Sequence, residues 1–471
     1  MMTRRVALVG CLVTGILVAA RPSFEAGVSA APYLQQTASE VTVNMPTGGK
    51  PPRVAIPAAI GLGADTELSA AAGVVLATLW ADLNFEEEFD LVSRDAVAKL
   101  PVGDSLDTLP YDRLAELGAD FVTFTRITRV ETGFKVELQL IGVRGAAAKK
   151  IGFEGNYAAC AIQTPRACAH LIADDMHKRV RHLDGLAQTR LAFTSDRDQE
   201  RMTGRFVAGS QGKEIYIADY DGENQRRITA NQSLNLAPSW GPDGRTLAYV
   251  SYVAQSPDIF VRDVFEARLP TRPAAGTTQM ENTLPAFSPD GSKIAFSSTR
   301  AGNWDIWVVN RDGSGLRNLT NNSVGSVINN APTWSPTGAQ IAFTSNRTGS
   351  NQIYMMTAEG TGLEKLTSDP GVDRPTWSPA PYNDIAYTSG VQSGHDINLF
   401  DVSTRQVRVL TSGLGDNGSP TFAPNGRHIA FVTSRWGKDQ VAIIDRKGNI
   451  QLKVTAQGAN TFPNWSRTPR Q

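Results

Sequence analysis

The second half of the chain alternates apolar and polar residues in short runs that return at a regular interval. Runs such as IAFSS at 294–298 and IAFTS at 341–345 have the period of two that is typical of strands. A short polar turn and a second apolar strand follow each run, and an Asp-Gly or similar turn comes after that second strand. A proline–x–aromatic segment precedes these runs, with its aromatic residue at positions 240, 287, 334, 377, 422 and 465. The spacing of 43 to 47 residues is that of a four-stranded blade, so the pattern predicts a six-bladed β-propeller.

The two ends of the repeat array complement each other. The first unit starts with the strand-like run LAFTS at 191–195 and has no aromatic segment before it, whereas the last unit ends at Trp465 and Ser466 with no strand after it. We therefore expect a propeller over residues 190–471, closed by pairing of its N- and C-terminal strands. One aromatic residue at a fixed place in each blade is expected to pack between blades rather than to bind a sugar.

The first half lacks the repeat and predicts a mixed α/β domain over residues 31–185. Residues 66–84 carry apolar side chains at helical spacing, including Leu68, Val75 and Leu79. Further helices are expected at 111–118 and, starting at a proline, at 165–182. Strands are expected at 53–57, 90–93, 121–130, 134–143 and 151–157.

The N-terminus has the features of an export signal. Arg4 and Arg5 precede an uncharged, largely apolar run at 6–20, which is short for a membrane span and suits a signal peptide within residues 1–30, cleaved near residue 20 or near residue 30. An uncleaved anchor helix and a lipidated Cys11 are the alternatives. The segment 21–40 is small, polar and proline-containing, which predicts a flexible tail that is either a spacer or a docking peptide.

Charge and cysteine content narrow the classes of partner and chemistry. The 46 basic and 46 acidic residues give no net charge, which argues against a nucleic-acid partner. Five histidines and no CxxC or HExxH motif leave little for a zinc site. If Cys11 is removed with the signal, Cys160 and Cys168 remain as a disulfide candidate in an exported chain, or as two separate small apolar residues.

One polar position recurs at the start of the predicted inner strands. Three residues before the leading proline stand Asn235, Asn282, Asn329, Asn417 and Asn460; the remaining unit has Val372 there, followed by Asp373. Glu281 and Asp416 lie beside two of these asparagines. Each asparagine could simply bond its own backbone in a turn. Alternatively, these residues form a polar, mildly acidic channel mouth that binds a partner's loop or a cation such as calcium.

No catalytic motif accompanies the propeller. None of the serines lies in a Gly-x-Ser-x-Gly motif, and phosphate-loop and dinucleotide fingerprints are absent. We therefore predict a protein that is not an enzyme and has no cofactor. The alternatives left open are a periplasmic propeller hydrolase and a binder of cell-wall sugars.

The combination of export signal, α/β domain and propeller resembles the TolB family of the Tol-Pal envelope system. The resemblance is carried by DYDGENQ at 219–225, WGPDG at 240–244, FSPDGSKIAF at 287–296, and by Ala169, His170, Ala173 and Asp174 in the first domain. The linker at 186–191 and the two later cysteines depart from the family pattern.

This resemblance implies a function in the cell envelope. It implies a periplasmic monomer that binds the peptidoglycan-associated lipoprotein Pal through the propeller and meets membranes only through its partners. It also implies that the tail docks to a TolA-like inner-membrane protein. The role implied is to maintain the outer membrane and to aid envelope constriction during cell division.

Overall fold

The computed structural model describes residues 50–468, apart from 203–210, 255, 278, 322–324 and 393. The predicted signal peptide, Cys11 and the tail at 21–40 lie outside the described residues, and so do residues 469–471.

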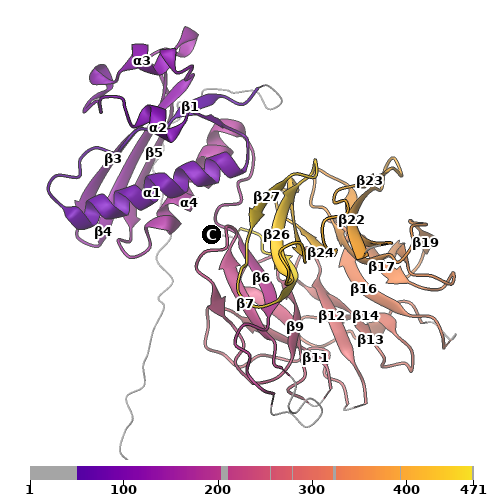
Figure 1. The fold of residues 1–471 in the computed structure, drawn as a ribbon. Helices are drawn as coiled ribbons and strands as arrows, with labels where there is room; N and C mark the ends of the chain where they lie inside the picture. Colours follow the sequence, from indigo (N-terminus) through magenta and orange to yellow (C-terminus); the bar gives the residue numbers. More distant parts are fainter. Residues whose placement is uncertain are drawn as a thin grey trace, which may run out of the picture. The chain divides into compact units, whose positions relative to one another are not determined.

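The first domain is a five-stranded sheet with helices on both faces (Figure 1). Its strands are β1 (Arg53–Ala55), β2 (Asp90–Leu91), β3 (Phe121–Val130), β4 (Gly133–Gly142) and β5 (Ile151–Cys160), in the order β2-β1-β3-β4-β5. β1 is parallel to both of its neighbours, and the other pairs are antiparallel. The helices are α1 (Thr66–Phe85), α2 (Arg94–Val97), α3 (Tyr111–Glu116) and α4 (Pro165–Arg181), with 3-10 turns η1 (Leu106–Thr108) and η2 (Gly145–Ala147).

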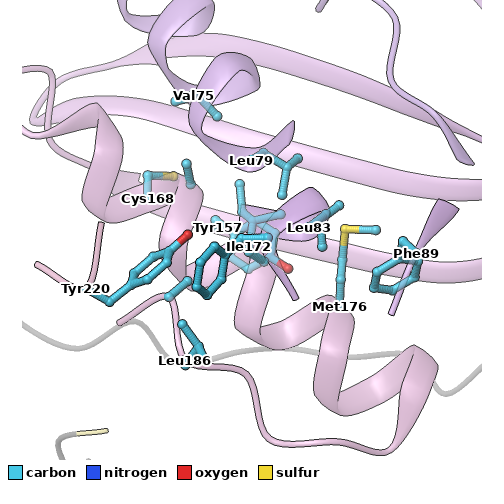
Figure 2. Packing of buried hydrophobic residues seen from close by; sticks show 14 of the residues in the cluster. Val75, Leu79, Leu83, Phe89, Tyr157, Cys168, Ile172, Met176, Leu186 and Tyr220 are labelled. Carbon is cyan, nitrogen blue, oxygen red and sulfur yellow. The ribbon is translucent and has the colours of Figure 1, made fainter. Parts of the chain in front are cut away.

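Helix α1 is the central helix of this domain. The Asp65 carboxylate caps its first turn by accepting from the backbone N–H of Leu68 at 2.8 Å. Its apolar side packs with α4 against the sheet; Figure 2 shows Val75, Leu79 and Leu83 of α1 facing Ile172 and Met176 of α4. Among the helices of the described residues, α1 is the one that is long and apolar enough to span a membrane. Half of its apolar stretch is buried inside the domain, as expected for a core helix.

Helix α4 begins at Pro165, where the missing N–H costs nothing, and ends at Arg181; the next residue, His182, caps the helix in the left-handed conformation. The structure joins Cys160, the last residue of β5, to Cys168 in the first half of α4 by a disulfide, with 5.5 Å between the two Cα atoms. Both cysteines are buried, so the bond fastens α4 to the sheet within the core.

The second domain is the predicted six-bladed propeller. Its inner strands, in chain order, are β9 (Asn235–Trp240), β12 (Asn282–Phe287), β16 (Asn329–Trp334), β20 (Asp373–Trp377), β24 (Asn417–Phe422) and β28 (Asn460–Trp465). Second strands are β10 (Thr246–Ser251), β13 (Lys293–Ser298), β17 (Gln340–Ser345), β21 (Asp384–Val391), β25 (His428–Thr433) and β6 (Arg190–Ser195). Third strands are β11 (Asp258–Asp263), β14 (Asp305–Asn310), β18 (Gln352–Thr357), β22 (Gly394–Asp401), β26 (Gln440–Asp445) and β7 (Glu214–Asp219). The outer strands are β15 (Arg317–Asn318), β19 (Glu364–Lys365), β23 (Val407–Val409), β27 (Ile450–Lys453) and β8 (Arg226–Arg227).

The ring closes as the sequence predicts. β28 pairs antiparallel with β6, from Asn460 opposite Ser195 to Trp465 opposite Leu191, so one sheet contains both ends of the array. Figure 1 accordingly shows the first, magenta blade beside the last, yellow one. The recurrent aromatics pack between blades: Trp334, for example, lies in one buried cluster with Ile306 of the preceding blade and Ile341 of its own.

A bulge recurs in every inner strand. The residue directly before the leading proline has a positive φ between 48° and 53°, although none of the six is glycine: Ala237, Leu284, Ala331, Arg374, Ser419 and Phe462. The register of each inner strand shifts at this point. Such strained positions persist only where the surroundings fix them, and here they let the chain turn its next residues toward the central channel.

Candidate partner-binding end of the propeller

The five recurrent asparagines are fully buried and couple neighbouring blades. Each amide donates to a side-chain oxygen at the start of the third strand of the preceding blade. The donor–acceptor pairs are Asn235–Glu214 (2.9 Å), Asn282–Asp258 (2.9 Å), Asn329–Asp305 (3.2 Å), Asn417–Asp396 (3.0 Å) and Asn460–Gln440 (3.0 Å).

Further side chains support some of these contacts. Between the blades that contain β22 and β24, the Thr411 hydroxyl donates to Asp396 at 2.8 Å and accepts from the Ile397 N–H at 2.9 Å. The Arg435 guanidinium donates to the side-chain amide oxygen of Asn417 at 3.2 Å. A buried polar group that lost its partner here would destabilise the fold by about 1–3 kcal/mol, so these side chains define the register between blades.

The structure therefore gives the asparagines a role between blades that neither interpretation of the sequence predicted. They bond a neighbouring blade rather than only their own turn, and a side chain with no exposure cannot touch a partner. An acidic or amide residue stands 20 to 24 positions before each asparagine, and this recurrence is the signal that sequence reasoning missed.

The three acidic candidates at the same end remain accessible. Glu281 is exposed, Asp416 has a side chain 56% exposed and bonded to His395 at 2.8 Å, and Asp373 is 37% exposed beside Arg374. We call this end, where the inner strands begin, the Asn end. The prediction of a partner site here now depends on these acids.

Large apolar side chains are also exposed at the Asn end. They are Val253, Ile328, Val391, Leu414 and Trp436, between 41% and 65% exposed. Val391 is the last residue of the second strand β21, and the other four lie after a second strand or before an inner strand; all these positions are at this end. Exposed apolar side chains with charged residues beside them suit a protein-binding surface, which has an apolar centre and a polar rim.

The central channel is lined by equivalent residues of all six inner strands. One cavity along it measures about 190 Å³ and is walled mainly by Ser, Thr, Pro and aromatic residues. Nearer the Asn end, Arg374 reaches over the ring of Phe462 at 4.2 Å. The described residues that line these two cavities include no carboxylate, which makes this stretch of the channel unfavourable for a cation.

The opposite end of the propeller contacts the α/β domain. Glu86, at the end of α1, is buried and pairs with Arg427 of the propeller; Asn425 donates to it at 3.2 Å and the Leu186 N–H at 3.0 Å. Burial alone would raise the pKa of Glu86, but the charges of His177 and Arg427 lower it below its usual value. The acid is thus held as a carboxylate in the domain junction.

A second polar cluster lies beside it. Asp82 of α1 accepts from the Tyr220 hydroxyl of the propeller at 2.7 Å and contacts His170 of α4 at 2.8 Å. Burial works against the charge on His170, but the bond to Asp82 raises its pKa overall. Asp82, His170 and Asp221 are close enough to resemble a metal-ligand set, yet Asp221 pairs with Arg166, so each acid already has a partner.

The linker between the domains is fixed by Asp174. Its carboxylate accepts from the backbone N–H groups of Ala187 at 2.8 Å and Gln188 at 3.1 Å, and from the Gln188 amide at 3.0 Å. Burial raises the pKa of Asp174 to about 6, and the nearby charge of Glu86 adds to this shift. Figure 2 shows Leu186 of the linker and Tyr220 of the propeller beside the α4 core residues.

An α/β domain joined to a six-bladed propeller, closed by its own first and last strands, places the chain among two-domain propeller proteins. The family model described as the TolB beta propeller domain matches residues 177–469. The chain belongs to this family.

Relatives and solved structures agree with this assignment. The chain is 31% identical over 198 residues to the Tol-Pal system protein TolB of Desulfosudis oleivorans, covering 41% of each chain. It is 29% identical to that of Mannheimia succiniciproducens, covering 39% of this chain and 40% of the relative, so the matches span about two fifths of these relatives. The crystal structure of TolB from Acinetobacter baumannii superposes with a TM-score of 0.70 at 22% identity, covering 89% of this chain and 97% of that one, which shows the shared fold.

Proposed function

We propose that this chain is a non-catalytic periplasmic component of a Tol-Pal system. In this proposal the Asn end of the propeller binds the peptidoglycan-associated lipoprotein Pal, and the protein acts as a monomer that reaches the membranes through its partners. It helps to maintain the outer membrane and aids constriction of the envelope at division. Its relatives are named Tol-Pal system proteins, which supports membership in that system.

The observation that carries the proposal is the difference between the two ends of the propeller. The α/β domain contacts one end through Arg427, Asn425 and Tyr220. At the Asn end, the exposed acids Glu281 and Asp416 stand among exposed apolar loops. A partner that presents basic and apolar side chains would find complementary groups there.

A TolA-like inner-membrane protein is the second proposed partner. We place its docking peptide in residues 21–40, which lie outside the described residues. If the tail is the docking peptide, a chain that lacks it should fail to bind the TolA-like protein while it still binds Pal. Loss of both partners on deletion of the tail would contradict separate sites.

A pull-down tests the proposed function. The chain from residue 31 is immobilised and exposed to a detergent-solubilised envelope extract, and the retained proteins are identified by mass spectrometry. Recovery of a Pal-type lipoprotein is the expected result. Retention of cell-wall fragments alone, or hydrolysis of a peptide or glycoside panel by the purified chain, would favour a sugar binder or a hydrolase instead.

A further inference from the structure

The central channel of the propeller contains a cavity of about 140 Å³ on the side of the Asn end. Its walls are the six positive-φ residues of the inner strands together with the prolines and polar residues that follow them. Five of these six residues are uncharged, and the sixth is Arg374 of β20. We call this space the Arg374 cavity. It is smaller than the range of about 300–1,000 Å³ that is typical of drug-sized ligands, so it suits a small ion or molecule.

Arg374 extends across the channel at this level. The central carbon of its guanidinium group lies 4.2 Å from the centre of the Phe462 ring, which belongs to β28. The inner strand between β20 and β28 around the ring is β24, which contributes Ser419 to the same cavity. Because Arg374 contacts a residue two blades away, its guanidinium group lies over the channel and not in the wall of its own blade.

The positive charge of Arg374 is only partly balanced. Asp373 approaches its Nε atom to 3.5 Å but does not line the cavity. Neither terminal nitrogen of the guanidinium group has a hydrogen-bond partner among the described residues, and both are accessible, because the side chain is 32% exposed. Burial in the channel lowers the pKa of Arg374, and the charge of Asp373 opposes this effect only in part. The two terminal nitrogens are thus available to a ligand in the channel.

Other side chains of the cavity wall also present hydrogen-bond donors. The side-chain oxygen of Asn464 accepts from the Trp240 N–H at 2.7 Å, which leaves the amide NH₂ group to donate. The hydroxyl oxygen of Thr333 accepts from the Trp377 N–H at 3.3 Å, so its own proton can be donated elsewhere. Since the described residues that line the cavity include an arginine and no carboxylate, its side chains favour a negatively charged acceptor.

We propose that the Arg374 cavity binds one small oxyanion, such as phosphate or a short carboxylate, through the two terminal nitrogens of Arg374 and the hydroxyl of Ser419. The planar guanidinium fork can donate two parallel hydrogen bonds to either kind of oxyanion. A free ion is favoured over the acidic side chain of a partner because the cavity is small and lies inside the channel, past the residues at which the inner strands begin. This site does not depend on the proposed function.

The test uses inorganic phosphate and the full chain from residue 31, in a buffer that contains no other oxyanion. Phosphorus NMR follows the line width of phosphate during the titration. Saturable one-to-one binding is expected, and acetate should displace the phosphate. R374Q removes both the charge and the fork, so it should weaken phosphate binding by about tenfold or more. R268Q makes the same change of charge at an arginine that is 84% exposed and lines neither channel cavity, and it should leave binding unchanged.

A second variant of the same residue separates the fork from the charge. R374K keeps the positive charge without the planar fork, so it should bind phosphate more weakly than the parent chain and more tightly than R374Q. Absence of saturable binding to the parent chain, equal binding by R374Q, an equal loss in R268Q, or failure of acetate to compete would each overturn the proposal. A capped Gly-Glu-Gly peptide that displaced phosphate at a lower concentration than acetate would overturn the assignment to a free ion.

Discussion

His428 in the domain junction should make the stability of the protein depend on pH. It begins β25, is 3% exposed, and stacks on Phe85 of α1 with 4.8 Å between ring centroids. Burial lowers the pKa of His428 from 6.5 to about 4, with a further lowering by the charge of Arg427. The folded protein therefore holds a neutral imidazole at pH values where an unfolded chain is already protonated.

The sign and size of the effect follow from these two values. Between pH 6.5 and pH 4 the unfolded state binds more protons at His428, so the free energy of unfolding falls as the pH falls. From pH 7 to pH 5 this loss is about 2 kcal/mol. Asp174 acts in the opposite direction: its pKa is raised to about 6, so the folded state binds more protons and gains about 1 kcal/mol over the same interval.

Because the two contributions oppose each other, the assay compares a variant with the parent chain. H428F keeps an aromatic ring against Phe85 and removes the titration. Urea unfolding, followed by tryptophan fluorescence, gives the free energy of the first cooperative transition at pH 7 and at pH 5. On going from pH 7 to pH 5, H428F should lose about 2 kcal/mol less than the parent. An equal change in both proteins would refute the buried, neutral state of His428, and D174N should shift the comparison in the opposite direction.

Three further predictions concern the stability of the two domains. R427M leaves the carboxylate of Glu86 buried without its cation, so the free energy of unfolding in urea should fall by about 3–5 kcal/mol; a loss below 1 kcal/mol would show that the junction does not depend on this pair. N417A removes a contact between blades and should lower the free energy of propeller unfolding by about 1–3 kcal/mol, while a thermal scan that matches the parent would contradict the coupling role. C160S/C168S opens a short loop and should cost roughly 2–3 kcal/mol, and reduction of the parent chain should reproduce that loss.

Most of the propeller could be predicted from the sequence because the same strand and turn pattern recurs in each blade. Six aromatic segments at regular spacing and two complementary ends determine the number of blades and the closure. The recurrent bulges could not be predicted in the same way. Their left-handed residues include Leu284, Arg374 and Phe462, whose side chains do not favour that conformation, so tertiary packing imposes it.

The α/β domain shows the same division between regular elements and tertiary detail. The long helices and the strands β3 and β4 lie within a residue or two of the predicted bounds. The strand expected at 53–57 ends at Ala55, and the short helix α2 was not expected at all.

Only part of the candidate site could be predicted from the sequence. A polar residue at the same position in five blades identified the asparagines as candidates. A repeated residue type shows that its surroundings recur, but it does not show whether the side chain is buried or exposed. Asn282 is buried against Asp258 of the preceding blade, whereas the adjacent Glu281 is exposed. The contacts between domains, such as Tyr220 with Asp82, join residues 138 positions apart and leave no local signal.

Direct binding of the Pal-type lipoprotein tests the central claim most closely. Isothermal titration of its soluble domain into the chain from residue 31 should give a one-to-one complex. E281K, at the Asn end, should weaken binding by about tenfold, while E359K, an exposed charge reversal in the turn after β18, should not. No binding to the parent chain, or equal weakening by both variants, would contradict the assignment of the Asn end as the partner site.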